Sequence, residues 1–463
     1  MALIHIFTSL IVIFISKKLF IIAFGEMRIN KYMPHTHLWL WQLIVLSLVG
    51  ANLMVVGVRA DIITNFVQNE QSYLFSLWSV YYTMLMFPVA IIFFNNIIGL
   101  KINKYFKLFL NKKVEYSYKD SDSRIKIFFY CMSIISIFVV VYLCYYNAPL
   151  FMYLTGRIDR VLNARVAYDR AFEGSKLIKN VIGESIIPLA SYIAFAYYKF
   201  TKQKHWKIIF TILCMCALFI SGANMSKSGL AWYFLPYVFI ITSMNGKIPY
   251  KKLFKIILII APIPLYMYTV QYARAGFGIT DIILNFYGGP LGRIFIGQIQ
   301  SLPAYFEIFP DLYEFLLGKS ISLFSYIGLP FIETARIAAT YIEPVGVQEG
   351  WVNVANTFFI GDAYANFGLI GVLFSPIWVA FVYSIFYRLL VTHRKSPLSI
   401  GCYVFILNNL TESLTGSFFS AYVVNTRVIS SLLFLLCIKI FVSLLGANNI
   451  TTRNNNVKKI NLY

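Results

Sequence analysis

The chain has 463 residues, of which 59% are hydrophobic and only 13% are charged. Soluble domains are about a quarter charged, so this composition excludes an ordinary soluble domain and indicates a polytopic helical membrane protein. The apolar runs are continuous rather than alternating, which argues against a transmembrane barrel. The net charge of +21 fits the basic links that orient membrane proteins, so we expect contact with membrane lipid and none with nucleic acid.

Eleven apolar runs come close to, or exceed, the roughly 20 residues that span a bilayer. Short lysine-bearing links between them are expected in the cytoplasm, which puts the N-terminus outside and the C-terminus inside. We therefore predict an all-α polytopic fold, a single integral membrane domain over residues 1–463. Its eleven spans are expected at about 3–24, 38–57, 75–100, 127–147, 181–199, 207–222, 229–245, 253–272, 364–387, 398–415 and 428–446.

Lysine and arginine are distributed differently across this topology. The cytoplasmic side holds 22 Lys and 5 Arg, whereas the outer side holds 4 Lys and 9 Arg. Lysine on the cytoplasmic side follows the usual orientation rule, but arginine on the outer side opposes it. Because the guanidinium stays charged and donates paired hydrogen bonds, phosphate binding is the favoured explanation for the outer arginines.

Two outer loops, at about 148–180 and 273–363, are too long to be simple connectors. In the first loop, Arg157, Arg160 and Arg165 would fan over about 140° of one helix side if the segment is helical. Two interpretations stay open for this loop. It could be an amphipathic helix on the outer leaflet, touching lipid phosphate, or a clamp on a phosphorylated ligand.

The second loop contains Arg274 directly after a span, Arg293 after the turn 288–292, and Arg336 further on. Each arginine alone could be interfacial, but Trp or Tyr is the usual anchor at an outer span end. Asp362 follows Asn356, where the next span begins to enter the bilayer. A carboxylate there is costly, which makes Asp362 a functional candidate.

Other features of the outer side are weaker signals. Lys227, in the turn from Ser221 to Gly229, is either a further phosphate contact or an ordinary turn lysine. Glu184 and Glu412 lie near outer span ends, where carboxylates facing water are expected. The long outer loops contain no histidine, so a general base there is expected to be a carboxylate. No spacing of acids, His or Cys suggests a metal site.

Together these features resemble the Wzy-type oligosaccharide repeat unit polymerases, which make O-antigen, capsule and enterobacterial common antigen. The shared pattern covers most of the chain. It comprises the many-span layout, the arginine-rich segment Gly156 to Arg170, the turn Ser221 to Gly229, Arg274 after a span, and the entry Asn356 to Gly371. Lys227 stands where related enzymes often have arginine.

The resemblance implies a GT-C-like enzyme of the bacterial inner membrane, with its active site facing the periplasm and no cofactor or metal. It would transfer a growing glycan from one undecaprenyl diphosphate carrier to a repeat unit on a second carrier. A chain-length regulator is the protein partner that the resemblance suggests. The expected catalytic residues are Arg274, Arg293 and Asp362. The expected substrate-binding residues are Arg157, Arg160, Arg165, Lys227, Arg336 and Asn356.

Two other functions are left open by the sequence. One is a ligase that moves finished polymer onto another acceptor; ligases of this class commonly use an outer histidine, which this chain lacks in its long loops. The other is a transporter or flippase of lipid-linked glycan, which predicts charged residues deep in the spans. The middle of each predicted span is nearly free of charge, so the polymerase is favoured.

Overall fold

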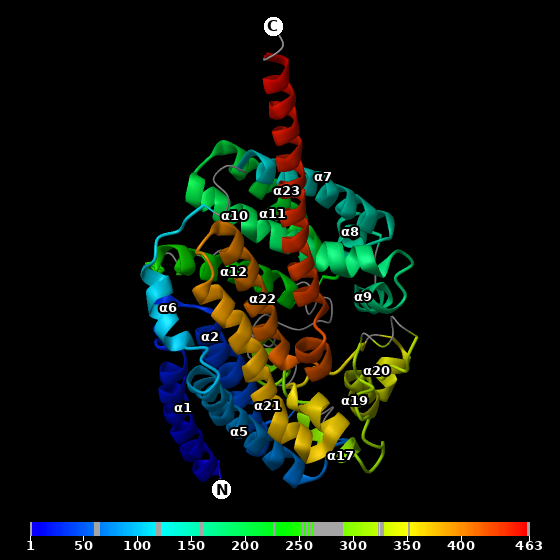
Figure 1. Ribbon diagram of the computed structural model, residues 1–463. Helices are drawn as coiled ribbons and strands as arrows, with labels where there is room; N and C mark the ends of the chain where they lie inside the picture. The colour runs from blue at the N-terminus through cyan, green and yellow to red at the C-terminus, as the bar shows by residue number, and fades with distance from the viewer. Residues whose placement is uncertain are drawn as a thin grey trace.

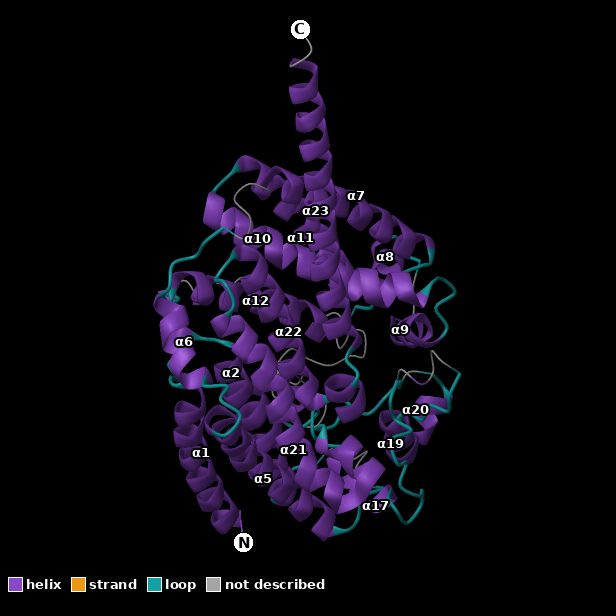
Figure 2. Cartoon of the chain, viewed as in Figure 1, coloured by secondary structure: helices purple, strands orange, loops and turns teal. Residues whose placement is uncertain are grey.

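The computed structural model describes residues 2–59, 65–116, 122–157, 161–225, 227–251, 290–322, 328–350 and 352–460, with a few single positions between them. In this part of the chain every regular element is a helix, as Figure 2 shows, which confirms the predicted all-α class. Eight helical stretches are long and apolar enough to cross a membrane: Leu3–Phe24, Pro34–Val55, Glu70–Asn96, Ser123–Tyr145, Leu177–Thr201, Lys204–Gly222, Ile360–Thr392 and Phe419–Leu445.

Three of the eleven predicted spans are not among these eight. Helices α12 (Lys227–Asn245) and α22 (Pro397–Glu412) occupy two of the predicted positions. Helix α22 has only 16 residues, fewer than a straight crossing of the bilayer needs. The third predicted span, 253–272, lies outside the described residues. Length and composition therefore support a membrane protein with eight candidate spans in the described part of the chain.

The spans pack against one another around an aromatic-rich core. Helix α1 (Ala2–Phe24) packs on α5 (Glu70–Asn96), which in turn packs on α21 (Ile360–Thr392). Helix α10 (Ile187–Thr201) lies between α11 (Lys204–Gly222) and α22. Large rings fill the space between the helices, and Tyr73, Tyr192, Trp206 and Tyr383 are all buried. Such rings remove much apolar surface from solvent or lipid and fix the helix positions.

Two ends of the helix bundle carry different segments. At one end lies α6 (Ile102–Asn111), which belongs to a lysine-bearing link; we call this end the lysine face. At the opposite edge of Figure 1 lie α8 (Pro149–Leu154), α9 (Val161–Arg170), α19 (Thr334–Ile342) and α20 (Pro344–Gln348). We call this end the loop face. The two long loops therefore meet at one end of the bundle.

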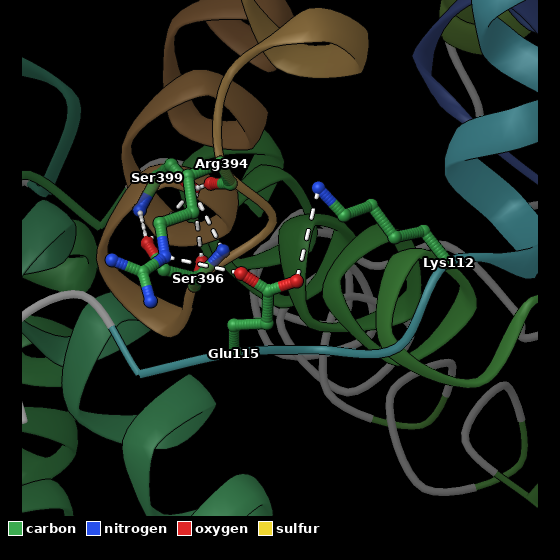
Figure 3. A network of polar contacts seen from close by, with 5 residues as sticks. All are labelled: Lys112, Glu115, Arg394, Ser396 and Ser399. Carbon is green, nitrogen blue, oxygen red and sulfur yellow. Dashed lines mark hydrogen bonds and ion pairs between the residues drawn. The ribbon is translucent and has the colours of Figure 1, made fainter.

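The lysine face is held together by a polar network that joins the link after α6 to the start of α22. Figure 3 shows the Glu115 carboxylate between the Lys112 ammonium, at 3.9 Å, and the Arg394 guanidinium, at 3.1 Å. Ser396 and Ser399 form a reciprocal capping box that satisfies free backbone N–H groups at the start of α22.

Lys395 completes this junction from the inside. Its buried Nζ donates to the backbone carbonyls of Phe109 and Lys112, each at 2.7 Å. These carbonyls belong to the C-terminal end of α6, where backbone acceptors lack partners within the helix. A cation placed there also interacts favourably with the helix dipole. Lys395 thus caps α6 and fixes it against the α21–α22 connection.

In the described part of the chain, three segments have π-helical hydrogen bonding: Leu38–Leu48, Leu177–Ile186 and Phe419–Val423, labelled η2, η4 and η6. Two of them, η4 and η6, lie at the loop-face ends of spans. π-Helical turns are rare in proteins as a whole, and many of those that occur lie at functional sites. The positions of η4 and η6 therefore indicate that a functional site lies at the loop face.

Candidate functional site

A cavity of about 370 Å³ lies at the loop face. Helix ends at that face form its lining. They belong to α7 (Asp122–Tyr145), α9, η4, α10, α11, α12, α22 and α23 (Thr426–Ile460). The volume is within the usual range for sites that bind small molecules. The predicted turn from Ser221 to Gly229 forms part of the wall through Ser221, Asn224 and Gly229.

One side of the cavity is an ion pair between α9 and η4. The buried Lys179 ammonium lies 3.5 Å from the Asp169 carboxylate and donates to the Tyr168 carbonyl at 2.8 Å. The same ammonium lies 4.0 Å from the centre of the Tyr168 ring, within cation–π distance. Asn224 Nδ2 donates to the other Asp169 oxygen at 2.7 Å. These contacts fix the Asp169 carboxylate in the wall.

Another part of the wall has two carboxylates near one arginine. Arg427 Nη2 lies 3.6 Å from Glu184 Oε2, and Arg427 Nη1 donates to Asn409 Oδ1 at 3.0 Å. Glu412 accepts a hydrogen bond from Asn408, one turn earlier on α22. The side chains of Glu184 and Arg427 are 40% and 42% exposed, so solvent reaches this pair. Glu412 has no salt-bridge cation within 4.0 Å among the described residues, whereas Glu184 does.

Aromatic rings line the rest of the wall. Trp232, Tyr168, Tyr192 and Tyr233 all border the cavity, and the rings of Tyr192 and Tyr233 stack with centres 5.4 Å apart. Such rings offer flat apolar faces with a polar atom at one edge. The cavity therefore combines carboxylates, carboxamides and aromatic faces, a set suited to a ligand that bears many hydroxyl groups.

The two long loops are joined directly by Arg170. Its guanidinium donates from Nε to Asn353 Oδ1 at 2.6 Å, and from Nη2 to the carbonyls of Asn353 at 2.9 Å and Val352 at 3.1 Å. Burial of the Arg170 guanidinium and the neighbouring charge of Arg336 both lower its pKa. The first loop is thereby attached to the second, and two of their arginines come close.

A second pair of arginines also combines one residue from each loop. Burial lowers the pKa of Arg165, the Asp169 carboxylate raises it, and the charge of Arg293 lowers it. Arg165 is half-buried on α9, and its Nε has no hydrogen-bond partner among the described residues. Arg293 is exposed on the short helix α16 (Pro290–Phe295). Arg165 is thus influenced by one carboxylate and by one arginine of the second loop, and an anion bound between the two arginines would offset their mutual repulsion.

The segment from Gly156 to Arg170 is helical only in part. Helix α8 ends at Leu154 and α9 begins at Val161, with Gly156 between them at φ +69°. A left-handed residue interrupts the helix, so Arg157 lies in a turn and is exposed, whereas Arg165 lies on α9. Since α9 packs against protein through buried Tyr168 and bonds to the second loop, its contacts favour the clamp over a helix lying on lipid.

The remaining predicted residues fall into three groups. Arg336, on α19, and Asn356 are exposed at the loop face, and the Asn356 carbonyl accepts a hydrogen bond from Ser301. Lys227 begins α12, the helix that contributes Trp232 to the cavity; the structure describes its backbone alone. Arg160 and Arg274 lie outside the described residues.

Asp362 is a buried structural acceptor in this geometry. Its side chain is 1% exposed, and both oxygens accept hydrogen bonds. Thr334 donates to Oδ1 at 2.8 Å, while Ser417 and the Phe419 backbone donate to Oδ2 at 2.7 and 3.1 Å. The carboxylate therefore ties α19 and the segment before α23 to the start of α21, and it does not line the cavity.

The kink in α21 explains the glycines near the start of this helix. Phe367 and Gly368 depart from helical geometry, and Gly368 has φ +57°. A Cβ atom at Gly371 would lie 2.1 Å from the Ala363 carbonyl oxygen, so the two halves of the helix approach closely at the kink. Gly361 is also tight, because a Cβ there would lie 3.1 Å from the Tyr305 ring. Close packing therefore needs glycine at these positions.

Sequence reasoning missed several residues of the cavity. Glu184 and Glu412 were interpreted as ordinary interfacial carboxylates, and Lys179, Arg427 and Trp232 were not selected at all. Their position in the sequence could have indicated them, because these five residues all lie close to a helix end at the loop face. What the sequence lacks is the tertiary contact that brings these separate helix ends together.

The described residues contain no group of three or more His, Cys, Asp or Glu side chains that could hold a metal ion. Comparison of the chain with protein-family models, with curated proteins and with solved structures finds no match. A functional assignment therefore depends on the geometry of the cavity and the two pairs of arginines.

Proposed function

We propose that this protein is a GT-C-like glycosyltransferase of the bacterial inner membrane that polymerises polyprenyl-diphosphate-linked oligosaccharide repeat units at the periplasmic face. The observation that carries the proposal is the position of α9. This one helix contributes Asp169 to the carboxylate-lined cavity and Arg165 to the arginine pair with Arg293. A sugar site and an anion site are thus adjacent, as a sugar attached to a diphosphate requires.

The chemistry requires positive charge on the leaving group and a base for the nucleophile. In the transfer, the bond between the anomeric carbon and the carrier diphosphate breaks, and a hydroxyl oxygen of the acceptor sugar bonds to that carbon. Arg165 and Arg293, with Arg274 as a further candidate, would stabilise the departing diphosphate without a metal. We assign Glu412 as the acceptor of the hydroxyl proton, because Glu184 is paired with Arg427 and Asp169 with Lys179.

The second arginine pair fits the second substrate. Polymerisation joins two lipid-linked glycans, so two carrier diphosphates must be held at the loop face at once. Arg336, beside Arg170, would contact the second diphosphate, since Arg170 itself is engaged with the second loop. Further contacts with the carriers are assigned to exposed or nearby loop residues, namely Arg157, Arg160, Lys227 and Asn356. A chain-length regulator would act on this assembly as a protein partner.

The distribution of buried charge favours a transferase over a flippase. Among the described Lys, Arg, Asp and Glu side chains, the buried ones are Lys179, Asp362 and Lys395. Each lies near a helix end rather than in the middle of a span. A flippase for an anionic glycan would need charge along a path through the bilayer.

The proposal is tested by complementation in a strain that makes a surface polysaccharide. Deletion of the gene should leave single repeat units on the surface, and the natural gene should restore a ladder of chain lengths on a gel. Glu412→Gln, Arg274→Ala and Arg293→Ala should each fail to restore the ladder at normal protein levels. Glu349→Gln, an exposed loop carboxylate away from the cavity, is the matched control and should restore it.

Two results would contradict the proposal. If the deletion strain shows no surface repeat units at all, the protein moves the lipid-linked unit across the membrane rather than joining units. If Glu412→Gln restores the full ladder, Glu412 is not the base that accepts the hydroxyl proton.

A further inference from the structure

Polar residues recur every five positions along the second candidate span. They are His37, Gln42, Ser47 and Asn52, in a segment that is otherwise strongly apolar. Residues 38–48 form the π-helix η2, in which backbone bonds join residues five apart. Residues at this spacing therefore lie near one another along the helix, and Ser47 Oγ indeed donates to the Gln42 carbonyl at 2.7 Å. The repeat produces a polar stripe within the bundle.

The inner part of this stripe has unsatisfied hydrogen-bonding groups. Gln42 is 0% exposed, and neither its Oε1 nor its Nε2 has a hydrogen-bond partner among the residues that the structure describes. His37 is 5% exposed; its Nδ1 lies 2.7 Å from the Tyr32 hydroxyl, but its Nε2 also lacks a partner within the described residues. Burying such groups without partners is costly, above all in a membrane-spanning bundle.

His35 shows that burial alone does not leave a histidine unsatisfied here. It is 0% exposed, yet its Nδ1 lies 2.6 Å from the Tyr387 hydroxyl and its Nε2 lies 2.8 Å from the Glu26 carbonyl. The two histidines of the short helix α2 (Pro34–His37) are thus both buried but differ in their hydrogen bonding. Both ring nitrogens of His35 have hydrogen-bond partners, whereas only one ring nitrogen of His37 has a partner among the described residues.

The unsatisfied groups adjoin the cavity wall. The His37 ring packs edge-to-face on Trp232, with ring centres 5.4 Å apart. Trp232 also borders the cavity. The polar stripe therefore begins one aromatic ring away from a space that solvent reaches through the exposed Glu184–Arg427 pair.

We propose that His37 and Gln42 form a hydrated site inside the membrane-spanning bundle, and that its ligand is water. Water is the ligand that the chemistry selects, because a carboxamide needs both a donor and an acceptor and one imidazole nitrogen needs a single partner. Buried waters typically make about three such bonds to otherwise unsatisfied polar groups. The site does not depend on glycan transfer and would exist in the protein without substrate.

The test is hydroxyl-radical footprinting of the full chain in lipid nanodiscs, read by mass spectrometry. Radicals formed from water oxidise side chains that contact water, so His37 should be oxidised at least about tenfold faster than His35, although both are buried. Gln42→Leu should lower the oxidation rate of His37 several-fold. Thr83→Val is the matched control, since Thr83 is equally buried but bonds to the Ser79 carbonyl, and it should leave the His37 rate unchanged.

Two outcomes would overturn the inference. Equal and slow oxidation of His35 and His37 in the natural protein would mean that water does not reach the site, and this comparison needs no variant to fold. A higher unfolding temperature for Gln42→Leu, with no change in His37 oxidation, would mean that the amide is unsatisfied in a dry environment.

Discussion

The Asp362 carboxylate allows a sharp test between a structural role and a catalytic one. Asp362→Asn keeps the size of the side chain and removes its charge, whereas Asp362→Ala removes every acceptor. If the residue is a buried hydrogen-bond acceptor, the Asn variant should fold and retain chain extension, while the Ala variant should be severely destabilised. If it is the general base, both variants should lose chain extension alike.

The expected magnitudes follow from its contacts. Asp362→Ala leaves the Thr334 hydroxyl, the Ser417 hydroxyl and the Phe419 N–H without the carboxylate oxygens at 2.7–3.1 Å. Hydrogen bonds to a charged group contribute about 1.5–3 kcal/mol each, and hydroxyls can reorient, so a loss of roughly 3–6 kcal/mol is expected. In Asp362→Asn, the oxygen can still accept from Ser417 and Phe419, and the amide can donate to Thr334. Its cost is therefore about 1 kcal/mol.

Both quantities can be measured on the same three proteins. Thermal unfolding in detergent gives stability, and the surface polysaccharide ladder in a deletion strain gives chain extension. The structural interpretation expects an Asn variant with a near-normal unfolding temperature and a full ladder. An Asn variant that is equally stable but makes no ladder would refute it and return Asp362 to the chemistry. An Ala variant as stable as the natural protein would refute the hydrogen-bond argument itself.

Three further predictions concern the rest of the fold. Arg170→Lys removes the guanidinium fork that holds Asn353, so hydrogen exchange over residues 161–170 should rise about tenfold or more by mass spectrometry. Burial, and then the charge of Lys112, lower the pKa of Lys395 from 10.5 to about 8. Between these pH values the unfolded chain binds more protons, so the free energy of unfolding should rise with pH by up to roughly 3 kcal/mol, and Lys395→Met should abolish that rise in a pH series of unfolding curves. Gly25→Ala should lower the unfolding temperature more than Gly57→Ala, because both have φ near +90° but a Cβ at Gly25 alone would meet a carbonyl oxygen at 2.7 Å; equal losses would contradict this.

The helical class and most span positions could be predicted because they depend on local composition. A long apolar run has few alternatives to a helix in a membrane, since every backbone group must be satisfied within the segment. The first predicted span, 3–24, matches α1 despite Lys17 and Lys18 inside it. The helix ends were less predictable: α21 continues to Thr392, and α22 stops after 16 residues. Such ends are set by packing and caps, as in the Ser396–Ser399 box.

The candidate site was predictable only in part, because its residues come together through tertiary contacts. The sequence singled out the arginine-rich loops and the turn Ser221 to Gly229, and both border the site. It did not distinguish Glu412 from other carboxylates at span ends, since nothing local marks it. Its place beside a cavity depends on α9 and η4, which lie far from it in the sequence.

The contrast between Arg165 and Arg170 shows why spacing alone misassigns such residues. On a helical wheel Arg165 joins the fan of arginines, whereas Arg170 falls outside it. In the fold, the second loop lies on the side where Arg170 points, so the excluded residue makes the contact that joins the loops. Arg165 has a buried Nε with no hydrogen-bond partner among the described residues, and the charges of Asp169 and Arg293 both act on it. An arginine with protein acceptors stabilises structure, and an arginine without them is free to bind a ligand. That distinction depends on the partner segment, here 183 residues away for Arg170 and Asn353.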